Sequence, residues 1–202
     1  KNMRNKTLTE LYHLIGGTDK HSNTAVPWPT DDISHTYDGL YGPLWAHKKE
    51  SARKVLEIGV SWLGSGDLEV LGHHFPNAEV HGVDIDPLER VSEEHQAPNI
   101  TFHQMDGYNA ENLDKTFGDT KWDIVLDDGP HTVESQVKCL NYFHDKLAPH
   151  GMMLIEDIAG GINGRQVQEL YDSFEGDKHF LSFIDRTRGS KADDVIALYM
   201  PY

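Results

Sequence analysis

A regular alternation of short apolar runs and amphipathic stretches begins at residue 54 and continues almost to the end of the chain. The runs have the length and composition of buried parallel strands. Between them, apolar residues recur at helical spacing, most clearly over 132–147 and 164–174. This alternation predicts an α/β fold with a doubly wound, mostly parallel sheet. The expected strands are 54–60, 80–86, 100–106, 122–127, 152–155, 180–185 and 195–200.

The first 50 residues are less regular. Thr7 and Glu10 form a capping box, so a helix is expected to begin there. Residues 18–47 are interrupted by prolines and glycines. This segment also carries large aromatic side chains at Trp28, Tyr37, Tyr41 and Trp45. We expect a single domain, with residues 1–50 as a helix and cap and residues 51–202 as the ligand-binding core. Two interpretations of the aromatic segment stay open: a lid that closes over the cofactor and the acceptor pocket, or a satellite core on the sheet.

Composition narrows the class of protein. The 202 residues carry a formal net charge of -15, which disfavours nucleic acid and anionic membranes as partners. No apolar run is long enough to span a bilayer. The single cysteine, Cys139, excludes an intrachain disulfide and fits the reducing cytoplasm. Its place in an apolar helical pattern makes it a core residue. An oligomer is compatible with all of these features.

A glycine-rich turn follows the first expected strand, over Glu57–Gly66. Its glycine spacing is not that of the dinucleotide fingerprint. An acid two residues before the first glycine instead resembles the nucleotide-binding turn of class I S-adenosylmethionine (SAM) methyltransferases. The alternative is a tight structural turn. The residues expected to contact the cofactor are Glu57, Gly59, Ser65, Asp84, Asp106 and Asp127.

Two acids of this set have more specific expected roles. Asp84 ends the second strand about 20 residues after the turn, where a carboxylate can accept both ribose hydroxyls. Asp86 is expected to cap a helix beginning at Pro87. Asp106 ends the third strand and could accept the adenine amino group. The alternative is that these are solvated loop acids.

The fourth and fifth expected strands both end in acids. Asp127, Asp128 and His131 follow one, and Glu156 and Asp157 follow the other. Neighbouring strand ends meet at one edge of a parallel sheet, and an oxygen-rich pocket there suits Mg²⁺. These groups would repel one another unless a cation lay among them. A histidine beside the metal could act as a base. The alternative is a turn and a helix cap with exposed acids.

Several motifs together resemble the metal-dependent sugar O-methyltransferases that modify macrolide antibiotics. They are Gly17-Thr18-Asp19-Lys20, His35-x-Tyr37-x-x-x-Tyr41, the Glu57–Ser65 turn, Gly82–Asp86, Asp127-Asp128-Gly129-Pro130-His131 and Glu156-Asp157. The resemblance implies a seven-stranded sheet with an antiparallel last strand. It also implies Mg²⁺, or Mn²⁺, on Asp128, Glu156 and Asp157, with His131 as general base. The chain departs from the family pattern at Leu63 and Pro130.

We therefore expect a SAM-dependent O-methyltransferase that acts, with a metal ion, on a small polyhydroxylated acceptor resembling a sugar or a catechol. An NAD-type oxidoreductase is disfavoured by the glycine spacing. An RNA ribose 2′-O-methyltransferase is opposed by the acidic charge, and a non-catalytic SAM-binding module is a further alternative. The other histidines singled out, expected at the surface, are His73, His74, His144, His150 and His179.

Overall fold

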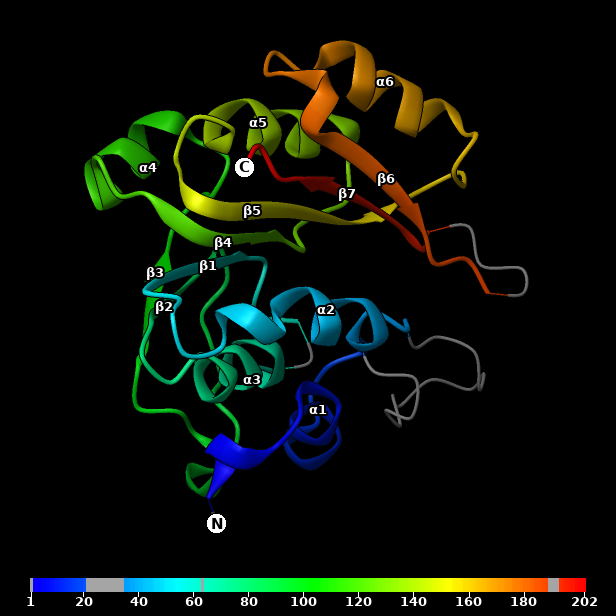
Figure 1. Ribbon diagram of the computed structural model, residues 1–202. Coiled ribbons are helices and arrows are strands. Elements are labelled where there is room, and N and C mark those ends of the chain that lie inside the picture. Colours follow the sequence, from blue (N-terminus) through cyan, green and yellow to red (C-terminus); the bar gives the residue numbers. More distant parts are fainter. Residues whose placement is uncertain (1, 21–34, 63, 189–192) are drawn as a thin grey trace.

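The computed structural model describes residues 2–20, 35–62, 64–188 and 193–202. Its centre is a seven-stranded sheet with the strand order β3-β2-β1-β4-β5-β7-β6 (Figure 1). All strands are parallel except β7, which runs antiparallel to both of its neighbours. The strands are β1 (Lys54–Ile58), β2 (Glu79–Asp84), β3 (Ile100–Gln104), β4 (Trp122–Asp127), β5 (Leu147–Ile158), β6 (Leu181–Asp185) and β7 (Val195–Tyr199). The predicted sheet and its antiparallel strand are confirmed.

Six α-helices within the described residues form two layers, with α1, α2 and α3 on one face of the sheet and α4, α5 and α6 on the other (Figure 1). They are α1 (Leu8–Ile15), α2 (Asp38–Trp45), α3 (Gly66–His74), α4 (Ala110–Phe117), α5 (Val133–Phe143) and α6 (Arg165–Ser173). Four 3₁₀ turns accompany them: η1 (Met3–Asn5), η2 (Ala46–Lys48), η3 (Glu93–His95) and η4 (Lys178–Phe180). None of these helices is long and apolar enough to cross a membrane.

The N-terminal helix begins as predicted. The Thr7 hydroxyl accepts from the Glu10 N–H, and the Glu10 carboxylate accepts from the Thr7 N–H. Leu11 of α1 and Trp45 of α2 lie in one buried cluster with Val55 of the sheet. The described residues before β1 therefore share the core of the sheet domain. Trp28, one of the aromatic residues of the predicted lid, lies outside the described residues, as does Leu63.

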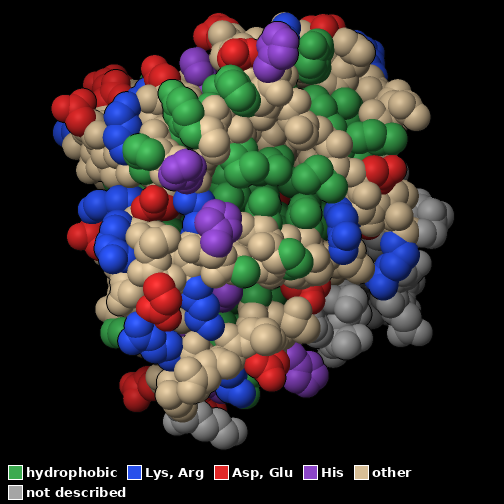
Figure 2. Space-filling model, in the orientation of Figure 1, with side chains coloured by type: hydrophobic (Ala, Val, Ile, Leu, Met, Phe, Trp, Pro, Cys, Tyr) green, Lys and Arg blue, Asp and Glu red, His purple; other side chains and the backbone are tan. Residues whose placement is uncertain are grey.

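A second buried cluster fills the opposite face of the sheet. It joins Leu113 of α4, Leu140 of α5 and Leu170 of α6 to strand residues such as Val125. Cys139 lies in this cluster with 1% of its surface exposed, as predicted. Figure 2 shows hydrophobic side chains gathered near the middle of the visible surface, with charged side chains more frequent toward its edges.

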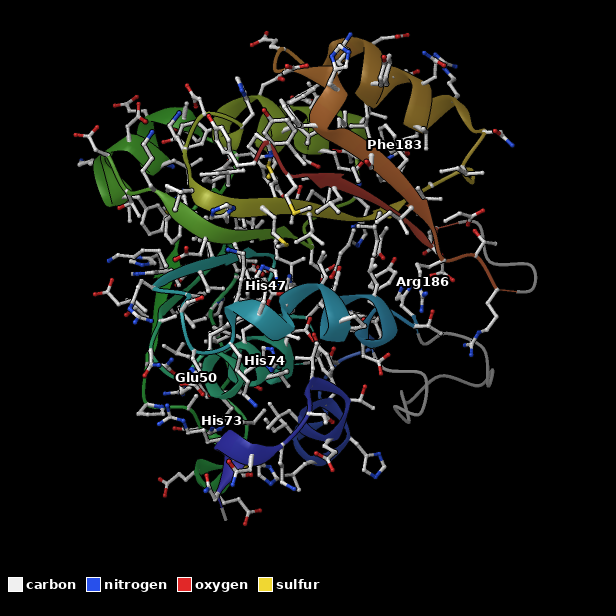
Figure 3. The ribbon with its side chains drawn as sticks, viewed as in Figure 1. His47, Glu50, His73, His74, Phe183 and Arg186 are labelled. Atoms are coloured by element: carbon white, nitrogen blue, oxygen red, sulfur yellow. The ribbon has the colours of Figure 1, made fainter. Side chains whose placement is uncertain are left out.

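Two predictions are wrong. No helix begins at Pro87: residues 87–92 are irregular, and the Val91 N–H, which a helix would direct to the Pro87 carbonyl, donates to the Ser65 hydroxyl at 3.0 Å. His74 is not at the surface: only 4% of it is exposed, and it lies between α2 and α3 beside Trp45 and Phe75 (Figure 3). The sequence did not predict this burial, because His74 is the last residue of α3 and the end of a helix is usually exposed.

The register of the sheet brings the acidic strand ends together. Asp127 of β4 lies beside Ile58 of β1 on one side and Ile155 of β5 on the other. The next residues along the chain, Asp128 after β4 and Glu156 within β5, therefore lie at the same edge. This is the edge at which open parallel sheets bind their ligands.

Candidate functional site: a cavity and an acidic cluster at the strand ends

A cavity of about 730 Å³ opens at the carboxyl ends of β1 to β4. This volume lies in the range of pockets that hold small molecules. Four of the predicted site residues line it: Gly59, Asp84, Asp106 and Asp128. The structure therefore brings residues from four strand ends to one cavity.

Gly59 allows the first strand to turn beneath this cavity. Its φ is +86°, in the left-handed region that favours glycine, and an added Cβ would lie 2.1 Å from the carbonyl oxygen of Asp128. Asp84 fixes the rest of the turn, because its Oδ2 accepts from the N–H groups of Val60 and Ser61, each at 2.9 Å. The turn is thus held in place by the residue expected to bind ribose.

The cavity also has apolar walls that the sequence did not reveal. Ile58, Met105 and Tyr108 line its interior, and Trp62 and Ile85 lie at its edge with 56% and 67% of their surfaces exposed. Large apolar side chains exposed at the mouth of a cavity are suited to cover a flat ligand. Tyr108 follows the predicted Asp106 by two residues, and this proximity was the one available signal.

Three residues expected to bind the cofactor do not line the cavity. Glu57 is fully buried behind it, and the Ser65 hydroxyl accepts from the Val91 N–H at 3.0 Å. Asp127 accepts from the Tyr108 hydroxyl and, at 3.1 Å, from the Gly129 N–H. Burial raises the pKa of the Asp127 carboxyl to about 7, although these hydrogen bonds oppose the shift. For these three residues, direct contact with a cofactor stays a prediction.

Asp128, His131 and Asp157 form the predicted acidic cluster beside the cavity. One ligand atom from each lies within 4.8 Å of the others. His131 Nε2 is 3.2 Å from Asp157 Oδ2 and 3.9 Å from Asp128 Oδ1. His131 and Asp157 both have left-handed backbone conformations, with φ of 60° and 55°. Such conformations are costly outside glycine and collect at functional sites, so the surrounding fold holds these side chains in place.

Lys20 was not predicted as a site residue, yet it lies within this cluster. Its Nζ is 2.5 Å from Asp128 Oδ2, 2.7 Å from Glu156 Oε2 and 2.7 Å from Asp67 Oδ2, with only 1% of the side chain exposed. Burial acts to lower the pKa of the ammonium, but the attraction of these carboxylates outweighs it and raises the pKa well above its usual value. Lys20 is therefore a buried cation among the predicted metal ligands.

Helix α2 supplies two hydroxyls to the same cluster. The Tyr41 hydroxyl donates to Glu156 Oε1 at 2.5 Å, and the Tyr37 hydroxyl donates to Asp157 Oδ1. Both tyrosines are fully buried. His35 stacks on Tyr37 and bonds to Asp194. These three side chains thus pack over the acidic strand ends, but none of them lines the cavity, so a role of the aromatic segment as a lid over the cofactor and acceptor stays a prediction.

The donor set fits a hard divalent cation. Its ligands would be carboxylate oxygens, which Mg²⁺ prefers. Burial, and then repulsion from Asp128, raises the pKa of the Asp157 carboxyl to about 7. Burial likewise raises the pKa values of Asp128 and Glu156, with Lys20 opposing it. These shifts mark unneutralised negative charge, which a cation would relieve. Asp128 and Asp157 present oxygens toward His131, whereas both Glu156 oxygens are engaged by Lys20 and Tyr41.

The comparison with known families decides the class of protein. Residues 56–158, about half of the chain, match the model of a methyltransferase domain. The chain belongs to the methyltransferase domain family. The matched residues include the glycine turn, all of the acids that line the cavity and the whole Asp128, His131 and Asp157 cluster.

Curated relatives of this methyltransferase are named as O-methyltransferases. It is 30% identical over 129 residues to 8-demethyl-8-alpha-L-rhamnosyl tetracenomycin-C 2'-O-methyltransferase from Streptomyces olivaceus, covering 61% of this chain and 33% of the relative. It is 30% identical over 130 residues to demethylmacrocin O-methyltransferase from Streptomyces fradiae, covering 61% and 32%. The match thus spans about a third of the length of each relative.

Among solved structures, the methyltransferase resembles MycE from the mycinamycin biosynthetic pathway, in complex with Mg, SAH and mycinamycin VI. The TM-score is 0.60 at 25% identity, and the match covers 77% of this chain and 40% of MycE. The two proteins share the class I methyltransferase fold, in agreement with the predicted fold class.

Proposed function

We propose that this methyltransferase transfers a methyl group from SAM to a hydroxyl of a small polyhydroxylated molecule, with the assistance of Mg²⁺. One observation carries the proposal: Asp128 lines the cavity and also belongs to the cluster with His131 and Asp157. A cofactor in the cavity and a cation on the cluster would therefore be neighbours. The O-methylation of a rhamnosyl compound named for one relative, and the Mg in the solved MycE complex, support this acceptor class.

The cavity would bind and orient the cofactor. Its acids, Asp84 and Asp106, suit ribose and adenine polar groups, and its apolar walls suit the flat base. SAM would supply the methyl group on a sulfonium that activates it for transfer. Holding the two reactants in line replaces an encounter in solution and provides a large part of the acceleration.

Asp128, Glu156 and Asp157 would hold the metal ion, and His131 would accept the proton of the acceptor hydroxyl at Nε2. When bound, Mg²⁺ lowers the pKa of a hydroxyl that it contacts. Burial, followed by the nearby positive charge of Lys20, lowers the pKa of His131, so its imidazole is neutral and able to accept a proton near neutral pH. The carboxylate of Asp157 would then stabilise the imidazolium, since it lies 3.2 Å away.

An acceptor screen tests this function. Labelled SAM is incubated with glycosides that carry vicinal diols, with catechols and with capped RNA, each with Mg²⁺ or with excess chelator. We expect methyl ethers of the small diols only, and only with Mg²⁺. Methylation of RNA alone would favour the ribose 2′-O-methyltransferase alternative. SAM binding without transfer to any acceptor class would favour a non-catalytic module.

A further inference from the structure

The Lys20 ammonium contacts oxygen atoms of two of the three proposed metal ligands. Its Nζ contacts Asp128 Oδ2 at 2.5 Å and Glu156 Oε2 at 2.7 Å. The second oxygen of Glu156 accepts from Tyr41, so neither Glu156 oxygen lacks a hydrogen bond. A carboxylate oxygen that accepts a hydrogen bond can also bind a metal ion, but an ion bridging Asp128 and Glu156 would have to lie where the Lys20 ammonium now lies.

Lys20 has acceptors on its other side. Its Nζ also lies 2.7 Å from Asp67 Oδ2 and 3.8 Å from Glu57 Oε2, which is too far for a hydrogen bond. Glu57 is fully buried, and neither of its oxygens has a hydrogen-bond partner. A buried carboxylate without a partner is costly and calls for an explanation. The unused oxygens of Glu57 provide a second position for the ammonium.

From these contacts we infer that Lys20 is a tethered cation that takes the place of the metal ion in the metal-free protein. A divalent ion competes with it for Asp128 and Glu156. When the ion binds, the ammonium moves toward Asp67 and Glu57, and the buried Glu57 carboxylate gains a partner. This inference rests on the proposed function, because it takes Asp128 and Glu156 as metal ligands.

Competition between Lys20 and the metal ion would lower the affinity of the site for metal. When a site must open before it binds its ligand, its apparent affinity is the intrinsic affinity multiplied by the fraction of molecules that are open. Lys20 keeps that fraction low, since its ammonium is neutralised by three carboxylates at hydrogen-bond distance. The protein would therefore stay stable without metal and respond only above a threshold metal concentration.

Mn²⁺ affinity measured by calorimetry, without SAM, tests the inference. Lys20→Met should bind Mn²⁺ about tenfold more tightly than the wild type, or better. Lys54→Met is the matched control, since it removes the same charge at the start of β1, where Lys54 pairs with Glu79. It should bind Mn²⁺ with wild-type affinity. Unchanged or weaker binding by Lys20→Met would overturn the inference.

A double variant separates competition from a general charge effect and guards against misfolding of the single variant. Lys20→Met with Glu57→Gln removes one positive and one negative group from the pocket, so its formal net charge is that of the wild type. It should still bind Mn²⁺ more tightly than the wild type. Wild-type affinity in the double variant would show that charge alone, not competition, is responsible. Absence of Mn²⁺ binding in every variant and the wild type would instead contradict the proposed metal site, and this inference with it.

Discussion

The Tyr41 hydroxyl lies 2.5 Å from Glu156 Oε1, so helix α2 contacts the acidic end of β5 directly. The contact joins residues 115 positions apart and lies inside the protein, where both side chains are almost fully buried. A hydrogen bond to a buried charged group contributes more to stability than one between neutral groups. The N-terminal segment is therefore part of the site and not only a covering for the sheet.

Replacing Tyr41 with phenylalanine should destabilise the protein. Removing the hydroxyl leaves Glu156 Oε1 buried without a donor, and the expected loss in the free energy of unfolding is roughly 1.5–3 kcal/mol. Urea unfolding measures it. Tyr12→Phe is the matched control, because the buried Tyr12 hydroxyl has no hydrogen-bond partner and its removal should cost little. Equal destabilisation by the two variants would mean that the Tyr41–Glu156 contact contributes nothing.

Asp84→Ala should weaken cofactor binding. The change removes the acceptor that holds the Val60 and Ser61 N–H groups and the carboxylate expected on ribose. We expect SAH affinity, measured by calorimetry, to fall roughly tenfold or more, the loss of one or two charged hydrogen bonds. Asp84→Asn should lose less, since its amide oxygen can still accept from the turn.

A control for Asp84 exists at the opposite end of β1. There Asp123 Oδ2 accepts from the N–H groups of Arg53 and Lys54 at 2.7 and 3.0 Å, the same type of contact. Asp123→Ala should lower the melting temperature but leave SAH affinity unchanged. Unchanged affinity in Asp84→Ala would show that the ribose assignment is wrong.

His131→Asn should lose turnover while keeping both ligands. Asparagine tolerates the left-handed backbone that His131 adopts, so the change removes the base with little strain. Turnover should fall roughly 10²–10⁴-fold, the usual contribution of a general base. His150→Asn is the matched control, because His150 has the same φ of 60° outside the site. A wild-type rate in His131→Asn would remove the histidine from the mechanism.

His74 should make the fold sensitive to acid. Burial lowers its pKa to about 4, and neither ring nitrogen has a hydrogen-bond partner. The unfolded chain takes up the proton near pH 6.5, before the folded protein does. Stability is therefore full above about pH 6.5 and is lost as pH falls toward 4, by up to about 3 kcal/mol. His74→Phe should lose less stability between pH 7 and 4.5 in urea unfolding, whereas His179→Phe, at an exposed position, should behave as wild type. Identical pH dependence in His74→Phe would contradict the assignment.

Local patterns predicted the sheet because its central strands are short apolar runs separated by polar and amphipathic stretches. β4 was predicted with its exact bounds, and β1 ends two residues early because Gly59 already turns away. The predicted helix at Pro87 failed because the Val91 N–H, which such a helix would direct to the Pro87 carbonyl, donates to the Ser65 hydroxyl instead. A one-dimensional pattern does not show such competition for a backbone N–H.

Some residues of the candidate site could be predicted from the sequence and others could not. Strand-end acids such as Asp84 and Asp128 could be predicted, because the topology of a parallel sheet places them together. Lys20 could not, because its ion pair with Glu156 joins positions 136 residues apart and depends on how the N-terminal segment folds back. Arg186, which lies against the start of α2 and donates to the Thr36 carbonyl, is a second contact of this kind (Figure 3).

The central claim is that the SAM methyl group and the metal ion lie side by side, on either side of Asp128. NMR of SAM labelled with ¹³C in the methyl group, bound to the protein with Mn²⁺ in place of Mg²⁺, tests this most directly. We expect paramagnetic Mn²⁺ to broaden the bound methyl resonance strongly in the wild type and to leave it sharp in Asp157→Asn, which should lose the metal ion and keep SAM. A methyl resonance that stays sharp in the wild type loaded with Mn²⁺ would contradict metal-assisted methyl transfer at this site.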